Sequence, residues 1–192
     1  MTEISTDPRP QLRATLDQTQ RQVDTVRPSQ LDLPTPCAEF DLQTLLAHLV
    51  AVLRKLTIVG HGGDMTLVAD PATAVVDEWA DVFQRARSEF DQTWAVDGKL
   101  VEDFALAWGT MTGTELLDAY THEFTVHAWD LSQATSRSGE LDPELAEAAL
   151  DWFSRNIGED DRVEGGPFGA AVPVARDADI YTLLAGFVGR PV

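Results

Sequence analysis

The stretch TGTELLDAYTHEFTVHAWDLSQA, residues 112–134, decides the fold of this chain. Thr112 and Glu115 have the spacing of a capping box, in which each side chain bonds the other residue's backbone where a helix begins. From there, an advance of about 100° per residue gathers apolar side chains on one side of a helix. These side chains are Leu116, Tyr120, Phe124, Leu131 and Ala134. We therefore predict a helix that runs to about residue 134 and turns this side toward a core.

Two ionisable residues share the apolar side of this helix. Glu123 and His127 are four residues apart, so their side chains lie on one face within reach of a single ion. A second pair with the same spacing, Asp118 and His122, falls on the other side, and we expect it to face water. Since 32 of the 192 residues are Asp or Glu, such a pair also arises readily by chance. The apolar surroundings distinguish Glu123 and His127, because a carboxylate and an imidazole in a core need a partner.

A second helix supplies a third polar group. Asp41 can cap a helix that runs to about residue 59, and His48 lies at the edge of its apolar stripe. The stripe consists of Leu42, Leu45, Leu46, Leu49, Val52, Leu53 and Leu56. Two facing helices of a bundle would aim His48, Glu123 and His127 at one interior point. Either a divalent metal, best matched by Zn²⁺ with a fourth position left for water or substrate, or a hydrogen-bonded cluster without metal would satisfy the three.

Apolar spacing elsewhere predicts more helices. They are expected between Pro10 and Pro28, from Asp70 through Val75 to Trp94, from Asp142 to Ile157, and over residues 180–188 after Asp177 as the cap. In the first of them, Gln18, Arg21 and Gln22 are placed on the outer side. Residues 99–108 lack a helical period and are expected to be irregular or a short hairpin, and residues 158–176 are expected to form a long loop.

These patterns predict an all-α fold. Four helices of roughly 17 to 25 residues joined by moderate loops are typical of a four-helix bundle, whose interior can hold metal ligands from facing helices. The additional C-terminal helices are expected to pack around it. The sequence has no repeat and no interdomain linker, and 192 residues with 44% apolar side chains suit one core. We therefore expect a single metal-binding domain over residues 1–192.

The charge of the chain limits its partners. Lys and Arg number 14 and Asp and Glu number 32, which gives a formal net charge of −18. Such a surface repels phosphate backbones and anionic headgroups, so we expect neither nucleic acid nor membrane as a partner. With no signal-peptide pattern or long apolar run, the protein is expected to be cytoplasmic, as a monomer or a homodimer. The single cysteine, Cys37, excludes an internal disulfide framework.

Two segments resemble the signatures of a known family. TPCAEFDLQTLLAH, residues 35–48, and EFTVHAWDL, residues 123–131, resemble those of the mycothiol-dependent maleylpyruvate isomerase N-terminal-like family, within the actinobacterial DinB-like metal-binding helical bundles. The tail, residues 168–174 and 189–191, resembles an uncharacterised branch of it. The resemblance implies a four-helix bundle and a divalent metal, usually zinc, held by His48, Glu123 and His127. In characterised members it also implies use of the thiol mycothiol.

The sequence departs from the family in two places. Phe40 stands where the family commonly has Trp, which is a small change in a core. The isomerase also carries a further C-terminal domain that contributes to its active site, and this chain is expected to lack it. The metal assignment does not depend on that domain, whereas isomerase activity does not follow for this chain.

Two functions are consistent with these features. The first is a metal-dependent transferase or isomerase, in which the ion presents mycothiol as a thiolate to a small electrophilic molecule. The second is a non-enzymatic metal- or ligand-binding bundle with a stress-response or interaction role. Other residues receive no firm role: Cys37 is read as a small buried filler and His61 as an exposed loop residue. Asp130 either orients a ligand or makes a structural bond.

Overall fold

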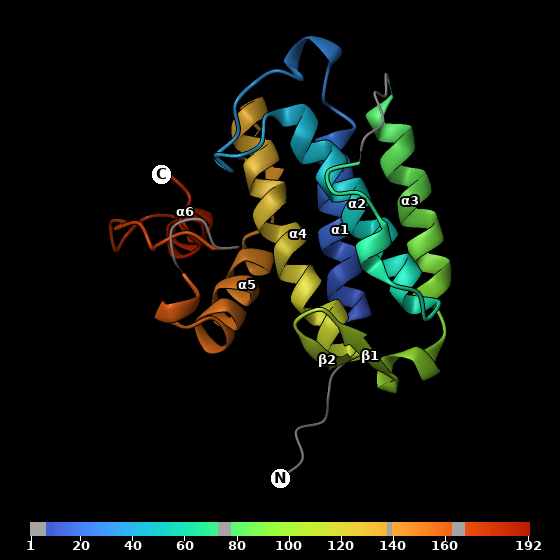
Figure 1. Cartoon of the computed structure of the whole chain (residues 1–192). Helices are drawn as coiled ribbons and strands as arrows, with labels where there is room; N and C mark the ends of the chain where they lie inside the picture. The colour runs from blue at the N-terminus through green and yellow to red at the C-terminus, as the bar shows by residue number, and fades with distance from the viewer. Residues whose placement is uncertain (1–6, 73–77, 138–139, 163–167) are drawn as a thin grey trace.

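The computed structural model describes residues 7–72, 78–137, 140–162 and 168–192. Four long helices lie side by side, and a short hairpin links the third to the fourth (Figure 1). These elements are α1 (Arg9–Val23), α2 (Leu42–Gly60), α3 (Trp79–Trp94), β1 (Asp103–Leu106), β2 (Gly109–Thr112) and α4 (Gly113–Thr135). The chain continues with α5 (Pro143–Asn156) and α6 (Ile180–Phe187), and its short 3₁₀ turns are Pro28–Gln30, Met65–Leu67, Asp97–Val101 and Glu159–Asp161. The prediction of an all-α four-helix bundle with additional C-terminal helices is confirmed.

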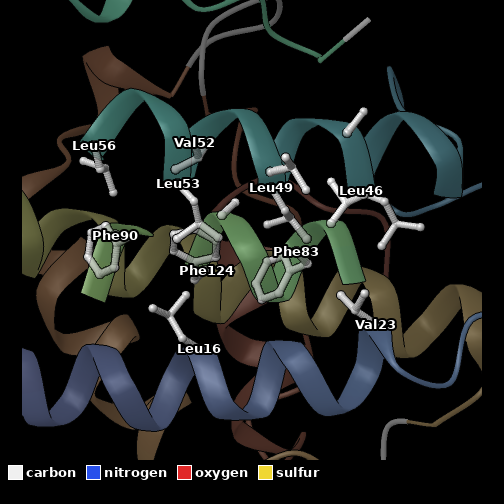
Figure 2. Packing of buried hydrophobic residues seen from close by; sticks show 14 of the residues in the cluster. Leu16, Val23, Leu46, Leu49, Val52, Leu53, Leu56, Phe83, Phe90 and Phe124 are labelled. Carbon is white, nitrogen blue, oxygen red and sulfur yellow. The ribbon is translucent and has the colours of Figure 1, made fainter. Parts of the chain in front are cut away.

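The main core fills the space between the four bundle helices (Figure 2). α1 packs on α4 and α2 packs on α3, so apolar stripes from all four meet along the bundle axis. Leucines of α2 contact Phe83 and Phe90 of α3 and Phe124 of α4 in this core. By length and composition α2 is apolar enough to cross a membrane, but 61% of its most apolar window is buried inside the protein. Its apolar character is explained by its central place in the bundle.

A second apolar cluster joins α5 and α6 to the side of α4 that faces away from α3 (Figure 1). α4 is therefore covered on two sides, and the prediction that His122 faces water is wrong. Its side chain is buried, with its ring 5.1 Å from that of Trp152 on α5. Asp118, the other member of that pair, lies 3.6 Å from His122 at the edge of this contact.

The outer side predicted for α1 is partly covered: Gln18 and Gln22 are buried, whereas Arg21 is exposed as predicted. Gln18 is buried: its amide nitrogen donates to the Tyr181 hydroxyl at 2.8 Å, and its oxygen accepts from the backbone N–H of Asp142 at 2.6 Å. Gln22, one turn later, is buried as well. The prediction failed because the C-terminal helices cover polar positions that a four-helix bundle alone would leave in water.

The helix ends follow the predicted caps with two exceptions. Asp41 accepts from the Thr44 backbone at the start of α2, and Thr112 and Glu115 form the capping box of α4. α3, however, begins at Trp79 rather than after Asp70, and the predicted Val75 lies outside the described residues. The cap of α6 is Asp179, not Asp177. The hairpin expected as one option for residues 99–108 is present but lies later in the chain, as β1 and β2 over residues 103–112.

The first residue of α4, Gly113, has no space for a side chain. A Cβ on Gly113 would lie 2.0 Å from the carbonyl oxygen of Lys99. Alanine is the better helix former by about 0.8–1 kcal/mol, but a clash with backbone cannot be relieved by a rotamer change. We expect Gly113→Ala to lower the free energy of unfolding by about 1–3 kcal/mol in urea denaturation.

The matched control for this variant is Gly98→Ala. A Cβ at Gly98 would have nothing within 4 Å, so its unfolding free energy should change by less than about 0.5 kcal/mol. If the two variants were equally stable, the close approach of α4 to Lys99 would not constrain the fold.

Candidate metal centre

His48 of α2 meets Glu123 and His127 of α4 at one point. One ligand atom from each of the three residues lies within 4.8 Å of the others. His48 Nε2 is 3.2 Å from Glu123 Oε1, and the two imidazole rings are 5.0 Å apart. His127 is buried, whereas 37% of the Glu123 side chain remains exposed. The three residues that the sequence singled out are therefore adjacent, and solvent reaches the cluster at Glu123.

A carboxylate and a lysine hold the ring of His48. His48 Nδ1 donates to Asp70 Oδ1 at 2.8 Å, and Lys55 Nζ donates to the other oxygen of Asp70 at 2.7 Å. Lys55 lies on α2, two turns after His48, so the helix that carries the ligand also anchors its carboxylate. Phe40 packs against the same ring at 5.2 Å.

A second carboxylate and an arginine hold the ring of His127 in the same manner. His127 Nδ1 donates to Asp130 Oδ2 at 2.9 Å. Arg190 donates to Asp130 through Nε, at 3.1 and 3.3 Å from its two oxygens, and through Nη2 at 3.1 Å. Asp130 therefore bonds both His127, a candidate ligand, and the segment after α6.

A glycine turn brings Arg190 to this position. Gly189 follows α6 with φ of +80°, and the N–H of Arg190 bonds the carbonyl of Ala185 at 2.8 Å to close the helix end. A Cβ on Gly189 would lie 2.5 Å from the backbone of Gly169, so no larger residue fits without a shift. The turn directs the next side chain back toward α4.

These contacts fix which nitrogen of each neutral imidazole carries the proton, in a way that suits a metal. With Nδ1–H donating to a carboxylate, Nε2 is the nitrogen left to face the cluster. Metal-bound histidines in proteins almost always make such an outer bond, because it fixes the ring and strengthens the ligand. Two nitrogens and one carboxylate oxygen match the donor set of zinc sites that keep an open position. Among the described residues, no fourth His, Cys, Asp or Glu joins the cluster.

The electrostatics of the cluster also favour a cation. Burial works to lower the pKa of His48, but its hydrogen bonds to Asp70 and Glu123 outweigh this and raise the pKa to about 9. Burial works to raise the pKa values of Glu123 and Asp130, and the neighbouring histidines lower both on balance. Without a metal, a proton on His48 therefore supplies positive charge at neutral pH, and metal binding would displace it.

The cluster forms part of the wall of a cavity of about 660 Å³. The lining comes from five parts of the chain: the loop before α2, α2 itself, α4, α5, and the C-terminal segment over residues 168–191. The lining residues are Pro36, Cys37, Ala38, Glu39, Phe40, His48, Glu123, Val126, His127, Phe153, Phe168, Gly169, Ala170, Val188, Gly189, Arg190 and Pro191. A volume of this size is in the range of pockets that hold a small-molecule ligand.

Of three other residues, Cys37 lines the cavity, whereas His61 and Trp108 do not. Cys37, read as a filler, lines the cavity, and burial raises the pKa of its thiol. His61 is exposed at the end of α2, where its Nε2 lies 3.1 Å from the Thr93 hydroxyl. Trp108 is 61% exposed and does not line the cavity.

Sequence reasoning missed Asp70, Lys55 and Arg190. Asp70 was assigned to a helix cap, and Arg190 entered only within the tail that resembles a family branch. Neither carries a periodic signal that would connect it to a histidine distant in the sequence.

Comparisons with known proteins agree with this architecture. A family model described as the mycothiol maleylpyruvate isomerase N-terminal domain matches residues 12–132. Uncharacterised proteins from two strains of Mycobacterium tuberculosis, CDC 1551 / Oshkosh and ATCC 25618 / H37Rv, are each 32% identical to this chain over 167 residues. Each match covers 87% of this chain and 88% of the relative.

Two solved structures share the fold. They are crystal structures of the mycothiol-dependent maleylpyruvate isomerase and of a mutant of it, with TM-scores of 0.57 and 0.58 at 14% identity. Each match covers 79% of this chain and 72% of the other. The DinB-like bundle expected from the sequence is thereby confirmed. The match of the family model over most of the bundle identifies the chain as a member of the mycothiol maleylpyruvate isomerase N-terminal domain family.

Proposed function

We propose that this protein is a metal-dependent enzyme of thiol chemistry, which uses mycothiol to act on a small electrophilic molecule by transfer or isomerisation. One observation carries the proposal: His48, Glu123 and His127 converge in the wall of a cavity large enough for ligands. Family membership supports mycothiol as the thiol. In this proposal residues 1–192 form one metal-binding domain that works in the cytoplasm.

The three residues would hold one divalent ion, and zinc suits their two nitrogens and one oxygen best. A divalent ion held there would supply positive charge that lowers the pKa of a bound thiol, so that a thiolate would be available at neutral pH. The chain itself supplies orientation. Asp70 and Asp130 keep Nδ1 of each imidazole protonated, so that Nε2 is free to bind.

The alternative is a metal- or ligand-binding bundle without catalysis. The same three ligands would serve it, but such a module does not need a cavity of about 660 Å³ beside them. With three candidate ligands in the part of the chain that the structure describes, the centre would also leave a coordination position for a substrate. Both features favour an enzyme over a structural metal site.

Metal content provides the first test. The purified protein should carry about one divalent ion per chain by elemental mass spectrometry. His127→Ala removes one of three ligands and should lose most of that metal. The matched control is His61→Ala, since His61 lies thirteen residues after His48 along α2, about 20 Å away. Similar losses in both variants would contradict the assignment of the ligands.

The carboxylate behind His127 provides the second test. Asp130→Asn keeps the shape of the side chain and removes its charge, so His127 is held less firmly. We expect the dissociation constant for Zn²⁺ to rise about 10–100-fold, measured by competition with a chromophoric chelator. Asp118→Asn, on the same helix beside His122, should leave that constant unchanged. An unaltered constant in Asp130→Asn would mean that Asp130 serves the fold alone.

Cobalt spectroscopy tests the thiol part of the proposal. In Co²⁺-loaded protein, mycothiol should produce intense near-ultraviolet absorption from a new metal–sulfur bond, because the three ligands supply no sulfur. The experiment uses Cys37→Ala, which removes the thiol that lines the cavity. S-methylated mycothiol is the control and should leave the spectrum unchanged. If saturating mycothiol left it unchanged at full Co²⁺ occupancy, the binding module would become the better description.

A further inference from the structure

We infer that the electrophile accepted by this cavity is an uncharged, apolar molecule about the size of an aromatic ring. The inference deepens the proposed function, since it names the class of molecule that would meet the thiol. It depends on two properties of the cavity wall: an apolar end built by α4, α5 and the C-terminal segment, and the absence of an uncompensated cation among the described lining residues.

The apolar end lies where the second cluster reaches the cavity. Val126, Phe153 and Val188 are buried members of that cluster, and each also lines the cavity. Phe168 completes this end, with its ring 5.3 Å from that of Phe153 at an angle of 72°. An edge-to-face pair of this kind offers a further ring both a flat face and an edge.

The cations of the protein are placed elsewhere. All 14 Lys and Arg residues fall within the described part of the chain, and Arg190 is the one among them that lines the cavity. Its Nε and Nη2 bond the carboxylate of Asp130, which is completely buried. The Asp130 carboxylate holds this guanidinium, so Arg190 already has its anion.

Negative charge predominates around the rest of the cavity. Glu39 and Glu123 line it, and Asp70 and Asp130 lie directly behind the two histidines. When both histidines are neutral, as metal ligands are, two cations stand opposite these four carboxylates: Lys55 and Arg190. A divalent ion would balance the remaining charge, and a bound thiolate would make the site negative again. An electrophile with a carboxylate would lose its hydration there without gaining a partner.

The reaction that fits such a ligand is substitution by the thiol. The sulfur of mycothiol forms a bond to an electrophilic carbon, and the bond from that carbon to its leaving group breaks. The leaving group departs with the electron pair, and the thiol proton goes to solvent. With an aryl chloride the products are a thioether, chloride and a proton, so atoms and electrons balance without an oxidant.

Binding of unreactive probes tests the inference directly. The probes are dinitrobenzene, which is uncharged, and dinitrobenzoate, the same ring with a carboxylate. We expect dinitrobenzene to bind at least about tenfold more tightly, in ligand-detected nuclear magnetic resonance titrations of zinc-loaded protein saturated with mycothiol. A second titration uses the metal-free protein, in which neither zinc nor thiol takes part. The difference in affinity between the two probes should persist in the metal-free protein even if the proposed thiol chemistry is wrong.

Two aromatic variants locate the bound ring. Phe168→Ala removes an aromatic wall that lies outside the helices, and it should weaken dinitrobenzene binding about fivefold or more. Trp108→Ala is the matched control, since Trp108 is 61% exposed and away from the cavity. Dinitrobenzoate binding as tightly as dinitrobenzene, or more tightly, would overturn the inference and make Arg190 an anchor for anions. Equal binding by the two variants, or no binding of dinitrobenzene, would also overturn it.

Discussion

The ion pair between Asp130 and Arg190 organises the part of the molecule that holds the candidate metal centre and the C-terminal segment. A carboxylate without exposed surface is stable only when partners match its charge and its lone pairs. Asp130 meets this need twice, with His127 one turn earlier on α4 and with Arg190 sixty residues later in the chain. One buried group therefore aligns an imidazole of the candidate metal centre and attaches the segment after α6 to the bundle. These partners keep the pKa of Asp130 low although burial alone would raise it.

The double covering of α4 explains why some of the molecule could be predicted from the sequence and some could not. Helix caps such as Asp41 and the pair Thr112 and Glu115 depend on residues within one turn, so local pattern was enough to find them. The burial of His122 and Gln18 depends on α5 and α6, which cover faces that α1 and α4 would otherwise turn to water. Periodicity reports which residues share a face, but not how many faces another element covers.

The candidate site divides in the same way. Glu123 and His127 could be paired from helical spacing and from the apolar side they share, and His48 could be added from its place at the edge of the apolar stripe of α2. The family resemblance implied the same three residues. The bonds that orient the histidines could not be predicted, because Asp70 and Arg190 reach their partners through tertiary packing alone. The cavity is even harder to predict from the sequence than these bonds. Its walls come from five parts of the chain, and no single segment shows that a space remains between them.

The placement of these walls separates two properties that evolution can alter independently. The three converging side chains belong to residues 12–132, which the family model matches, whereas Phe153, Phe168 and Val188 follow that region. Mutations after α4 can therefore reshape the cavity while the three candidate ligands stay unchanged. Under the proposed function, relatives with the same candidate centre can differ in their substrates, and exchange of the segments after α4 between paralogues is a simple route to new specificities.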